Sequence, residues 1–528
     1  MRNLHKFFPL LIAVIITALY WNSLSNSYVW DDRLNFSENH AIRDLPAAAR
    51  ACFTKDYHRV AVERYYRPVV TLSYALEYRA WKLNPAASHA VNISLHILAS
   101  IALYFFLSLL FGARAVPAAA TLLFATHPIA TNAVAQVNGR MEIFCTLFAL
   151  LSAICFLKAR RVPEKSFSYT AGSLLFFLLA LLSKEMALTI PVIFLLIHLA
   201  FPSPERRAAS LLPFFLLAAA YLIFRLGFIG GSAVSIERAL PPQATLLAMV
   251  KVTALYMRLL IFPARLCADY FSLPIPASFL SADVLLSLLA ITFAAAIAAV
   301  SFKRNRFVFF SILWFFITLA PVMNIVPLLS FVSEKFLYLP SIGFCVLAAV
   351  SLASLAKFPK LPKFTFWIAI LAVAIAYSAG TVRRNPVWKD ELTLFSDTVE
   401  CSPNSASAHV KLGNTLCNLG RCSEAIDEYK KAISLRHDPG IFKNLGEAYA
   451  REGDFENAAS AFGQYLKYHP ADLESCLRLG LAYELSGNLK EAITAYRGCE
   501  QLEPSDGRIG GKIRLLESRP ANGNNKSF

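Results

Sequence analysis

Charged residues are scarce in this chain of 528 residues. Asp, Glu, Lys and Arg together make up 16% of the sequence, whereas a soluble globular protein contains about a quarter. Hydrophobic residues make up 56%, and the mean hydropathy is +0.50. This balance excludes a disordered chain, a coiled coil and a soluble enzyme as descriptions of the whole molecule. We therefore expect a membrane protein with many spans.

The ten cysteines include no Cys-x-x-Cys pair and no Cys/His cluster at the spacing of a metal site. Four of them (Cys145, Cys155, Cys267 and Cys345) lie in apolar stretches, where cysteine mostly packs as a small hydrophobic residue. Cys417 and Cys422 would form a disulfide if their part of the chain is exported, but the sequence does not require it. We expect neither a metal nor a cofactor.

The net charge of +16 is unevenly distributed. Residues 1–382 carry +17 and residues 383–528 carry −1. The excess basic residues lie between hydrophobic segments, as in loops that face the cytoplasm and anionic lipid. This pattern indicates a membrane partner and argues against nucleic acid.

Twelve apolar segments are long enough, or nearly so, to cross a hydrocarbon core of about 30 Å. The first, 7–21, follows Arg2 and Lys6 and lacks a small-residue cleavage site, so it predicts an uncleaved span with a cytoplasmic N-terminus. The long loop at 23–88 is then expected outside. The remaining segments are 90–111, 116–136, 141–157, 167–182, 186–201, 209–229, 244–266, 281–301, 307–327, 337–356 and 364–382.

Basic clusters predict which loops are cytoplasmic. The clusters are Lys158/Arg160/Arg161/Lys165, Arg206/Arg207, Lys303/Arg304/Arg306 and Lys357/Lys360/Lys363. All four lie inside only if one segment between 167 and 266 does not cross. We select 244–266, because Lys251 and Arg258 share one helical face there. The expected count is about eleven spans, with the chain after residue 382 outside.

The last quarter of the chain repeats with a period of 33 or 34 residues. The recurring positions are Gly413, Gly446 and Gly480; Ala425, Ala458 and Ala492; Tyr429, Phe462 and Tyr496; and the closing Pro470 and Pro504. Small residues at helix contacts, an aromatic wedge and a closing proline are typical of tetratricopeptide repeats. The predicted fold is all-α: a polytopic membrane bundle (1–382), a linker (383–405), a soluble solenoid of three repeats (406–504) and a fraying polar tail (505–528).

Two adjacent carboxylates, Asp31 and Asp32, open the first outer loop. Such a pair can supply a general base and a neighbour that orients it. The alternative is a solvated turn before a helix.

Further ionisable side chains gather near the predicted outer ends of the spans. They include Arg67, His89, His96, His127, Arg140, Glu142, Lys184, Glu185, Asp269, Glu334 and Lys335. Each alone is compatible with an ion pair or a loop end. Together they predict a site at the outer surface. A transporter would place charges nearer the middle of the spans and usually shows two similar halves, which this sequence lacks.

With these motifs the chain resembles the membrane O-mannosyltransferases that carry a tetratricopeptide tail, the transmembrane and tetratricopeptide repeat proteins, including bacterial members. The likeness covers almost the whole chain, with the motifs in family order. They are Val29-Trp30-Asp31-Asp32 with Asn39, Tyr66-Arg67-Pro68, His89 with Asn92 and His96, His127-Pro128 with Gly139-Arg140, Ser183-Lys184-Glu185, and Glu334-Lys335 with Leu337-Tyr338-Leu339-Pro340. One departure is Thr131-Asn132, where the family commonly has Glu, so no acidic role is expected there.

The resemblance implies a C-type glycosyltransferase fold that transfers a sugar from a polyprenyl- or dolichyl-phosphate carrier to a hydroxyl, expected to be Ser/Thr of proteins, on the outer or lumenal face. It implies Asp31 as the catalytic base with Asp32 as its neighbour. The donor carries no nucleotide diphosphate, so a metal is not required. The expected ligands of the donor phosphate and substrate are Arg67, His127, Arg140, Lys184, Glu185, Arg258, Asp269, Glu334 and Lys335.

The repeats are expected to bind a protein or peptide acceptor through Asn414, Lys443 and Asn444, with a solvated face as the alternative. The expected location is a bacterial inner membrane with the repeats on the periplasmic side, or the endoplasmic reticulum membrane in a eukaryote. The alternative function is a non-catalytic membrane scaffold whose repeats recruit partners. Such a scaffold should tolerate Asn in place of Asp31.

Overall fold

The computed structural model describes residues 4–54, 57, 65–112, 115–202, 208–229, 241–270, 278–324, 331–355, 362 and 364–518. Over these residues the chain is helical and has no strand, so the all-α prediction is confirmed. Two compact units are present, Met1–Leu394 and Phe395–Phe528. Two of the predicted cytoplasmic clusters, Arg206/Arg207 and Lys357/Lys360/Lys363, lie outside the described residues.

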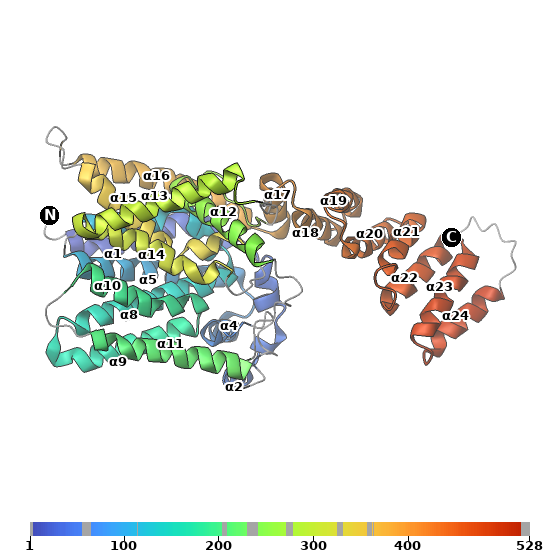
Figure 1. Cartoon of the computed structure of the whole chain (residues 1–528). Coiled ribbons are helices and arrows are strands. Elements are labelled where there is room, and N and C mark those ends of the chain that lie inside the picture. The colour runs from blue at the N-terminus through green and yellow to red at the C-terminus, as the bar shows by residue number, and fades with distance from the viewer. Residues whose placement is uncertain are drawn as a thin grey trace. The chain divides into compact units, whose positions relative to one another are not determined.

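The first unit is a helical bundle in which most of the long helices run roughly parallel to one another (Figure 1). Its main helices are α1 (Leu4–Tyr20), α5 (Pro85–Phe111), α6 (Ala115–Thr126), α8 (Arg140–Ala159), α9 (Ser166–Leu181), α10 (Ile190–Ala200), α11 (Leu212–Phe224), α12 (Pro242–Ile261), α13 (Ala282–Arg304), α14 (Arg306–Leu319), α15 (Ser341–Leu355) and α16 (Thr365–Arg384).

Local sequence explains where the longest of these helices begins and ends. Asn84 caps α5 by accepting a hydrogen bond from the backbone N–H of Ala87, and Pro85 occupies the first helical position. At the other end Gly112 adopts a left-handed φ of +66°, which glycine tolerates without strain. The helix between these two residues is long and apolar enough to cross a membrane, although it carries the buried polar side chains of His89, Asn92 and His96.

Six helices in the described part of the chain are long and apolar enough to cross a membrane, and several shorter apolar helices accompany them. This composition is that of a multi-pass membrane protein. The six include α12, the segment that we expect not to cross. Lys251 of α12 forms an ion pair of 2.6 Å with Asp283 at the start of α13. The number of spans stays a prediction.

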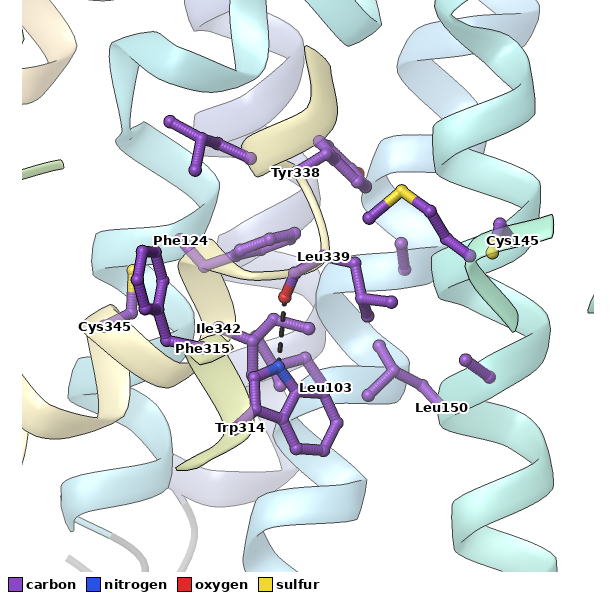
Figure 2. Packing of buried hydrophobic residues seen from close by; sticks show 14 of the residues in the cluster. Leu103, Phe124, Cys145, Leu150, Trp314, Phe315, Tyr338, Leu339, Ile342 and Cys345 are labelled. Carbon is purple, nitrogen blue, oxygen red and sulfur yellow. Dashed lines mark hydrogen bonds between the residues drawn. The ribbon is translucent and has the colours of Figure 1, made fainter. Parts of the chain in front are cut away.

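The bundle core joins segments that are far apart in the sequence (Figure 2). Trp314 of α14 is buried, and its indole N–H donates to the carbonyl of Leu339 at 3.1 Å. Its ring lies 5.8 Å from Phe106 of α5. At Gly343 of α15 an added Cβ would lie 2.5 Å from the carbonyl oxygen of Ser311, so α14 and α15 pack closely because this residue is glycine.

Short helices cover the end of the bundle opposite the N-terminus (Figure 1). They are α2 (Leu45–Ala51) and α4 (Pro68–Trp81), with α7 (Thr131–Val134) and the single turns η5 (Val137–Gly139), η7 (Glu185–Thr189) and η12 (Glu334–Leu337). Phe36, Val70 and Met141 belong to a separate small hydrophobic cluster beneath the first loop. This cluster fixes the loop that carries the candidate site.

The segment 382–391, which we name the strap, is bonded to the beginning of the first loop. Asn385 donates its side-chain amide to the carbonyl of Leu19 at 2.8 Å, and the backbone N–H of Ser27 donates to the carbonyl of Lys389 at 2.8 Å. Arg33 forms an ion pair of 3.0 Å with Glu391. The strap therefore holds the loop from the end of α1 to Arg33, two residues after Asp31.

The second unit contains three helix pairs, seen one after another in Figure 1. They are α18 (Ala406–Asn418) with α19 (Cys422–Leu435), α20 (Pro439–Arg451) with α21 (Phe455–Leu466), and α22 (Leu473–Leu485) with α23 (Leu489–Leu502). An added Cβ at Gly413 or Gly480 would lie 2.6 Å from the ring of Tyr429 or Tyr496. The predicted contact between a small residue and an aromatic wedge thus explains the glycine spacing, and the solenoid prediction is confirmed.

Two features of this unit differ from the sequence analysis or extend it. Residues Gly507–Glu517 form helix α24, with Ile509, Ile513 and Leu516 buried, although we expect a fraying tail from 505. The apolar spacing of four and three residues accounts for the helix, which covers the end of the solenoid. Disulfides join Cys417 to Cys422 and Cys476 to Cys499.

Candidate active site

Asp31 follows a residue with an unusual backbone. Trp30 has a φ of +52°, which is rare for a bulky residue and costs on the order of 1–3 kcal/mol. Such strain persists only where the surroundings impose it, and it is common at functional sites. The side chain of Asp31 is 20% exposed, so an incoming substrate can reach its carboxylate.

Two side chains from distant motifs contact this carboxylate. Lys335, in η12, places its Nζ 3.2 Å from Oδ2 of Asp31, across 304 residues of sequence. Asn138, in η5, donates a hydrogen bond from its side-chain NH₂ group to the same oxygen at 3.4 Å. Asn35 donates to the backbone carbonyl of Asp31 at 3.1 Å. The structure thus brings the first and last predicted motifs together.

Asp32 has a different environment, because it is buried. It accepts hydrogen bonds from the backbone N–H groups of Asn138 at 2.6 Å, Val137 at 3.2 Å and Val29 at 3.4 Å. Burial raises the pKa of Asp32 to about 7, against the effect of these three donors. The side chain therefore ties the first loop to η5 and sets the position of Asp31 relative to Asn138.

Arg140 is fully buried and is neutralised by Glu77 of α4 at 2.7 Å. Its Nε donates to Asn92 of α5 at 2.8 Å, and a terminal nitrogen donates to the carbonyl of Ser88 at 3.2 Å. The hydroxyl of Ser88 in turn donates to Glu77. This network joins α4, α5 and α8 directly behind η5.

Lys184 also forms a buried ion pair. Its ammonium contacts the carboxylate of Glu142 on α8, and the two side chains are 2% and 1% exposed. The ammonium also lies 4.7 Å from the centre of the Phe336 ring, next to Lys335. Lys184 therefore packs against η12 through the Phe336 ring and is not accessible to a ligand.

Arg67 is, like Lys335, a partly exposed cation of the site. Its side chain is 12% exposed, and its guanidinium forms an ion pair of 3.0 Å with Glu185. Arg225, at the end of α11, approaches the other oxygen of Glu185 at 3.6 Å. The Arg67 guanidinium also lies 4.4 Å from the centre of the Tyr65 ring.

Of the remaining predicted residues, Glu334, Asp269 and His127 are buried and Arg258 is exposed. Glu334 is buried and accepts a hydrogen bond of 2.6 Å from Tyr270, next to the buried Asp269. His127 is buried too, with Nε2 3.0 Å from the carbonyl of Leu260, and no contact in the described part of the chain joins it to Asp31 or Lys335. Arg258 has an exposed side chain in the last turn of α12.

A pocket lies beside Asp31. It is bordered by polar and apolar side chains from the first loop, α4, η5 and the start of α8. The lining residues are Asn35, Asn39, Ile42, Tyr57, Tyr65, Arg67, Val70, Thr71, Tyr74, Asn138 and Met141. Asn35 and Asn138 both contact Asp31 as well, so the pocket opens next to the candidate base.

Sequence reasoning did not single out Glu77, Asn138 or Asn35. The signal for Asn138 was available, because it directly precedes the Gly139-Arg140 motif. Among the described residues, no group of three or more His, Cys, Asp or Glu side chains has the arrangement of a metal site.

The predicted partner residues of the repeats form a ladder between neighbouring helix pairs. Asn444 donates to the side-chain carbonyl of Asn414 at 3.1 Å, and Tyr429 donates to the same oxygen at 2.7 Å. Lys443 pairs with Asp472 at 3.3 Å and with Glu474 at 3.2 Å. These three residues therefore share one face of the solenoid.

Both units of the chain resemble known proteins. A family model described as tetratricopeptide repeat matches residues 443–506. The Caenorhabditis elegans protein O-mannosyl-transferase F38B6.6 is 28% identical in an alignment that covers 81% of this chain and 62% of that protein. The human protein O-mannosyl-transferase TMTC3 is 25% identical over 94% of this chain and 55% of its own length.

Among solved structures, the crystal structure of MamA is 24% identical and covers 24% of this chain and 74% of that chain, with a TM-score of 0.23, too low to bear on the fold. The chain spans 62% and 55% of the lengths of the two relatives. The resemblance indicated by the motifs is confirmed: over most of its length, the chain is similar to TMTC-type proteins named as protein O-mannosyl-transferases.

Proposed function

We propose that this chain is a membrane glycosyltransferase that moves a mannose-type sugar from a polyprenyl- or dolichyl-phosphate carrier to a Ser/Thr hydroxyl of a protein. The observation that supports it most strongly is the accessible carboxylate of Asp31, oriented by Lys335 at 3.2 Å and placed beside a polar pocket. The names of the relatives supply the sugar and the acceptor class.

In the proposed reaction Asp31 accepts the proton of the acceptor hydroxyl. The hydroxyl oxygen then forms a bond to the anomeric carbon, while the bond from that carbon to the phosphate oxygen breaks. The carrier phosphate leaves with the electron pair, and a single displacement inverts the anomeric centre. Lys335 and Asn138 hold the carboxylate in one orientation throughout, which lowers the entropic part of the barrier.

Arg67 is the best candidate for holding the phosphate. Five cations were predicted for this role, but Arg140 and Lys184 are 0% and 2% exposed, and Lys335 and Arg258 are not among the residues that line the pocket. Arg67 lines the pocket and remains 12% exposed, and a phosphate there would compete with its partner Glu185. A guanidinium there stabilises the negative charge that develops on the leaving group. Arg140 and Lys184 then act as positioning residues.

The proposed site of reaction is the outer or lumenal face. The two disulfides of the repeat unit, Cys417–Cys422 and Cys476–Cys499, support an exported position, since disulfides persist in oxidising compartments. The basic residues that begin with Lys158 support a cytoplasmic position for the opposite end of α8. The repeats, with Asn414, Lys443 and Asn444 on one face, would then recruit a protein acceptor on the catalytic side.

The test is transfer of radiolabelled mannose from polyprenyl-phosphate mannose to protein by the purified full-length chain. Asp31→Asn should lower the rate by about 10²–10⁴-fold, which is the usual contribution of a general base. Glu38→Gln is a matched control, since Glu38 is an exposed acid of the same loop outside the pocket. Near-normal transfer by Asp31→Asn would refute the assignment and favour the scaffold function.

A further inference from the structure

We propose that Tyr256 of α12 is a positioning residue for the proposed reaction, because it holds the start of η12 in the place from which Lys335 reaches Asp31. This inference rests on the proposed function and adds to it a residue that does not line the pocket. Tyr256 is fully buried. It lies in the segment 244–266, whose neighbouring basic residues drew attention to it for topology alone.

The hydroxyl of Tyr256 binds both backbone groups of Ser333. It accepts a hydrogen bond from the N–H of Ser333 at 3.1 Å and donates to the carbonyl oxygen of the same residue at 3.4 Å. Ser333 is buried and is the residue at which the chain passes from an extended conformation into η12. A backbone N–H at such a position has no partner within the turn, and a buried donor without a partner is costly. The hydroxyl therefore fixes where η12 begins.

The residues on both sides of Lys335 are held as well. Glu334 accepts a hydrogen bond of 2.6 Å from Tyr270, in the segment that follows α12. On the other side, the hydroxyl of Tyr338 lies 2.6 Å from Nδ1 of His96 on α5, and both side chains are fully buried. Figure 2 shows Tyr338 within the bundle core. The backbone that carries Lys335 is thus anchored to α12 before this residue and to α5 after it.

The contact that these anchors position is a narrow one. Nζ of Lys335 lies 3.2 Å from Oδ2 of Asp31, near the upper limit of a good hydrogen bond. The side chain of Lys335 is only 13% exposed, so its neighbours limit how far it can follow a displaced backbone. A misplacement of about 1 Å can cost on the order of 10²-fold in rate. Loss of the two bonds made by Tyr256 should therefore affect the orientation of Asp31.

The first measurement needs no sugar donor. A water-soluble carbodiimide activates the carboxylate of Asp31, Nζ of Lys335 forms an amide with it, and the carbodiimide leaves as a urea that carries the displaced oxygen. Mass spectrometry of the purified full-length chain gives the yield of the joined peptides. The test variant is Tyr256→Phe, which keeps the ring and removes the hydroxyl. Tyr377→Phe is the matched control, because Tyr377 is also buried and its hydroxyl donates to the backbone carbonyl of Leu260 at 3.2 Å.

The second measurement is the rate of mannose transfer, in the single variants and in chains that also carry Lys335→Met. We expect Tyr256→Phe to lower the cross-link yield by about two- to tenfold, the effect of one hydrogen bond on a population. The same variant should lower the transfer rate by about 10- to 100-fold. In the Lys335→Met background it should change the rate by less than about twofold, because no contact is left to position. Tyr377→Phe should resemble the wild type in both measurements.

Equal cross-linking of the wild type and Tyr256→Phe would overturn the inference. A loss of rate that persists in the Lys335→Met background would overturn it too, since Tyr256 would then support the fold as a whole. If the cross-linking result holds while the wild type transfers no sugar, the proposed function fails and the positioning of Lys335 by Tyr256 stands.

Discussion

Removing the charge of Glu77 should destabilise the membrane unit far more than removing an exposed charge. Arg140 is 0% exposed and Glu77 is 3% exposed, with 2.7 Å between guanidinium nitrogen and carboxylate oxygen. Glu77→Gln keeps the shape of the side chain but leaves a buried cation without a counter-charge. The bonds of Arg140 to Asn92 and Ser88 remain, so the fold should persist in a weakened form.

The expected loss follows from this geometry. At 2.7 Å and an effective dielectric constant of about 20, the attraction between the two charges is about 6 kcal/mol. Breaking a buried pair by removing one partner typically costs about 3–5 kcal/mol, because the remaining charge stays desolvated. The melting temperature in detergent should therefore fall by of the order of 10 °C. The exposed pair of Arg33 and Glu38 is worth at most about 1 kcal/mol, so Glu38→Gln should change little.

A double-mutant cycle with Glu77→Gln, Arg140→Gln and both together isolates the pair. The double variant should be less destabilised than the sum of the single variants, by about 2–4 kcal/mol, since neither charge is then left alone. Thermal unfolding followed by intrinsic tryptophan fluorescence gives the three values. If the single effects add, the two charges do not depend on each other, and the account of Arg140 as a neutralised positioning residue is wrong.

Three further predictions concern η5, pH and topology. Gly139→Ala would place a Cβ 2.3 Å from a backbone carbonyl oxygen of α7, so the free energy of unfolding should fall by about 1–3 kcal/mol and the rate of sugar transfer should fall too. Gly227→Ala, which has open space around its Cβ, should leave both quantities unchanged. Burial raises the pKa of Asp32 to about 7, above about 3.9 for an unfolded chain, so its contribution to stability is greatest below pH 4 and is lost as the pH rises through 7. The unfolding free energy of the wild type relative to Asp32→Asn should therefore fall between about pH 4 and pH 8, and a flat difference would contradict this. Single cysteines introduced near Lys303 and Asn404 should react with impermeant reagents only from the cytoplasm and only from outside, respectively; labelling of both from one side would exclude eleven spans.

The gathering of Asp31 and Lys335 at one end of the bundle follows from span counting, because both lie at predicted outer ends. Their direct contact could not be predicted, since it depends on the short turns η5 and η12, whose course is set by tertiary packing. Glu77 is the clearest example of a site residue that could not be predicted from the sequence. It lies on α4 among other charged residues, and nothing in its neighbourhood distinguishes a buried partner of Arg140 from a solvated face.

The repeats were easier to predict than the site. Their period fixes which residues meet, and Gly413 against Tyr429 is one instance of a contact that recurs with the sequence. The terminal helix α24 begins 34 residues after α22, in step with the period, and was missed because Arg514 stands where the recurring glycine would lie. Local patterns therefore identify the solenoid, whereas the candidate site depends on contacts between segments hundreds of residues apart.

The strap has a consequence for how truncated forms of this protein should be interpreted. A deletion that begins at residue 383, where the apolar sequence ends, would remove Asn385, Lys389 and Glu391 together with the repeats. The loop before Asp31 would then lose its anchors, and activity would disappear even if the repeats had no part in catalysis. A truncation after Leu394 removes the second unit and retains these anchors. Only the second design separates recruitment by the repeats from support of the catalytic loop.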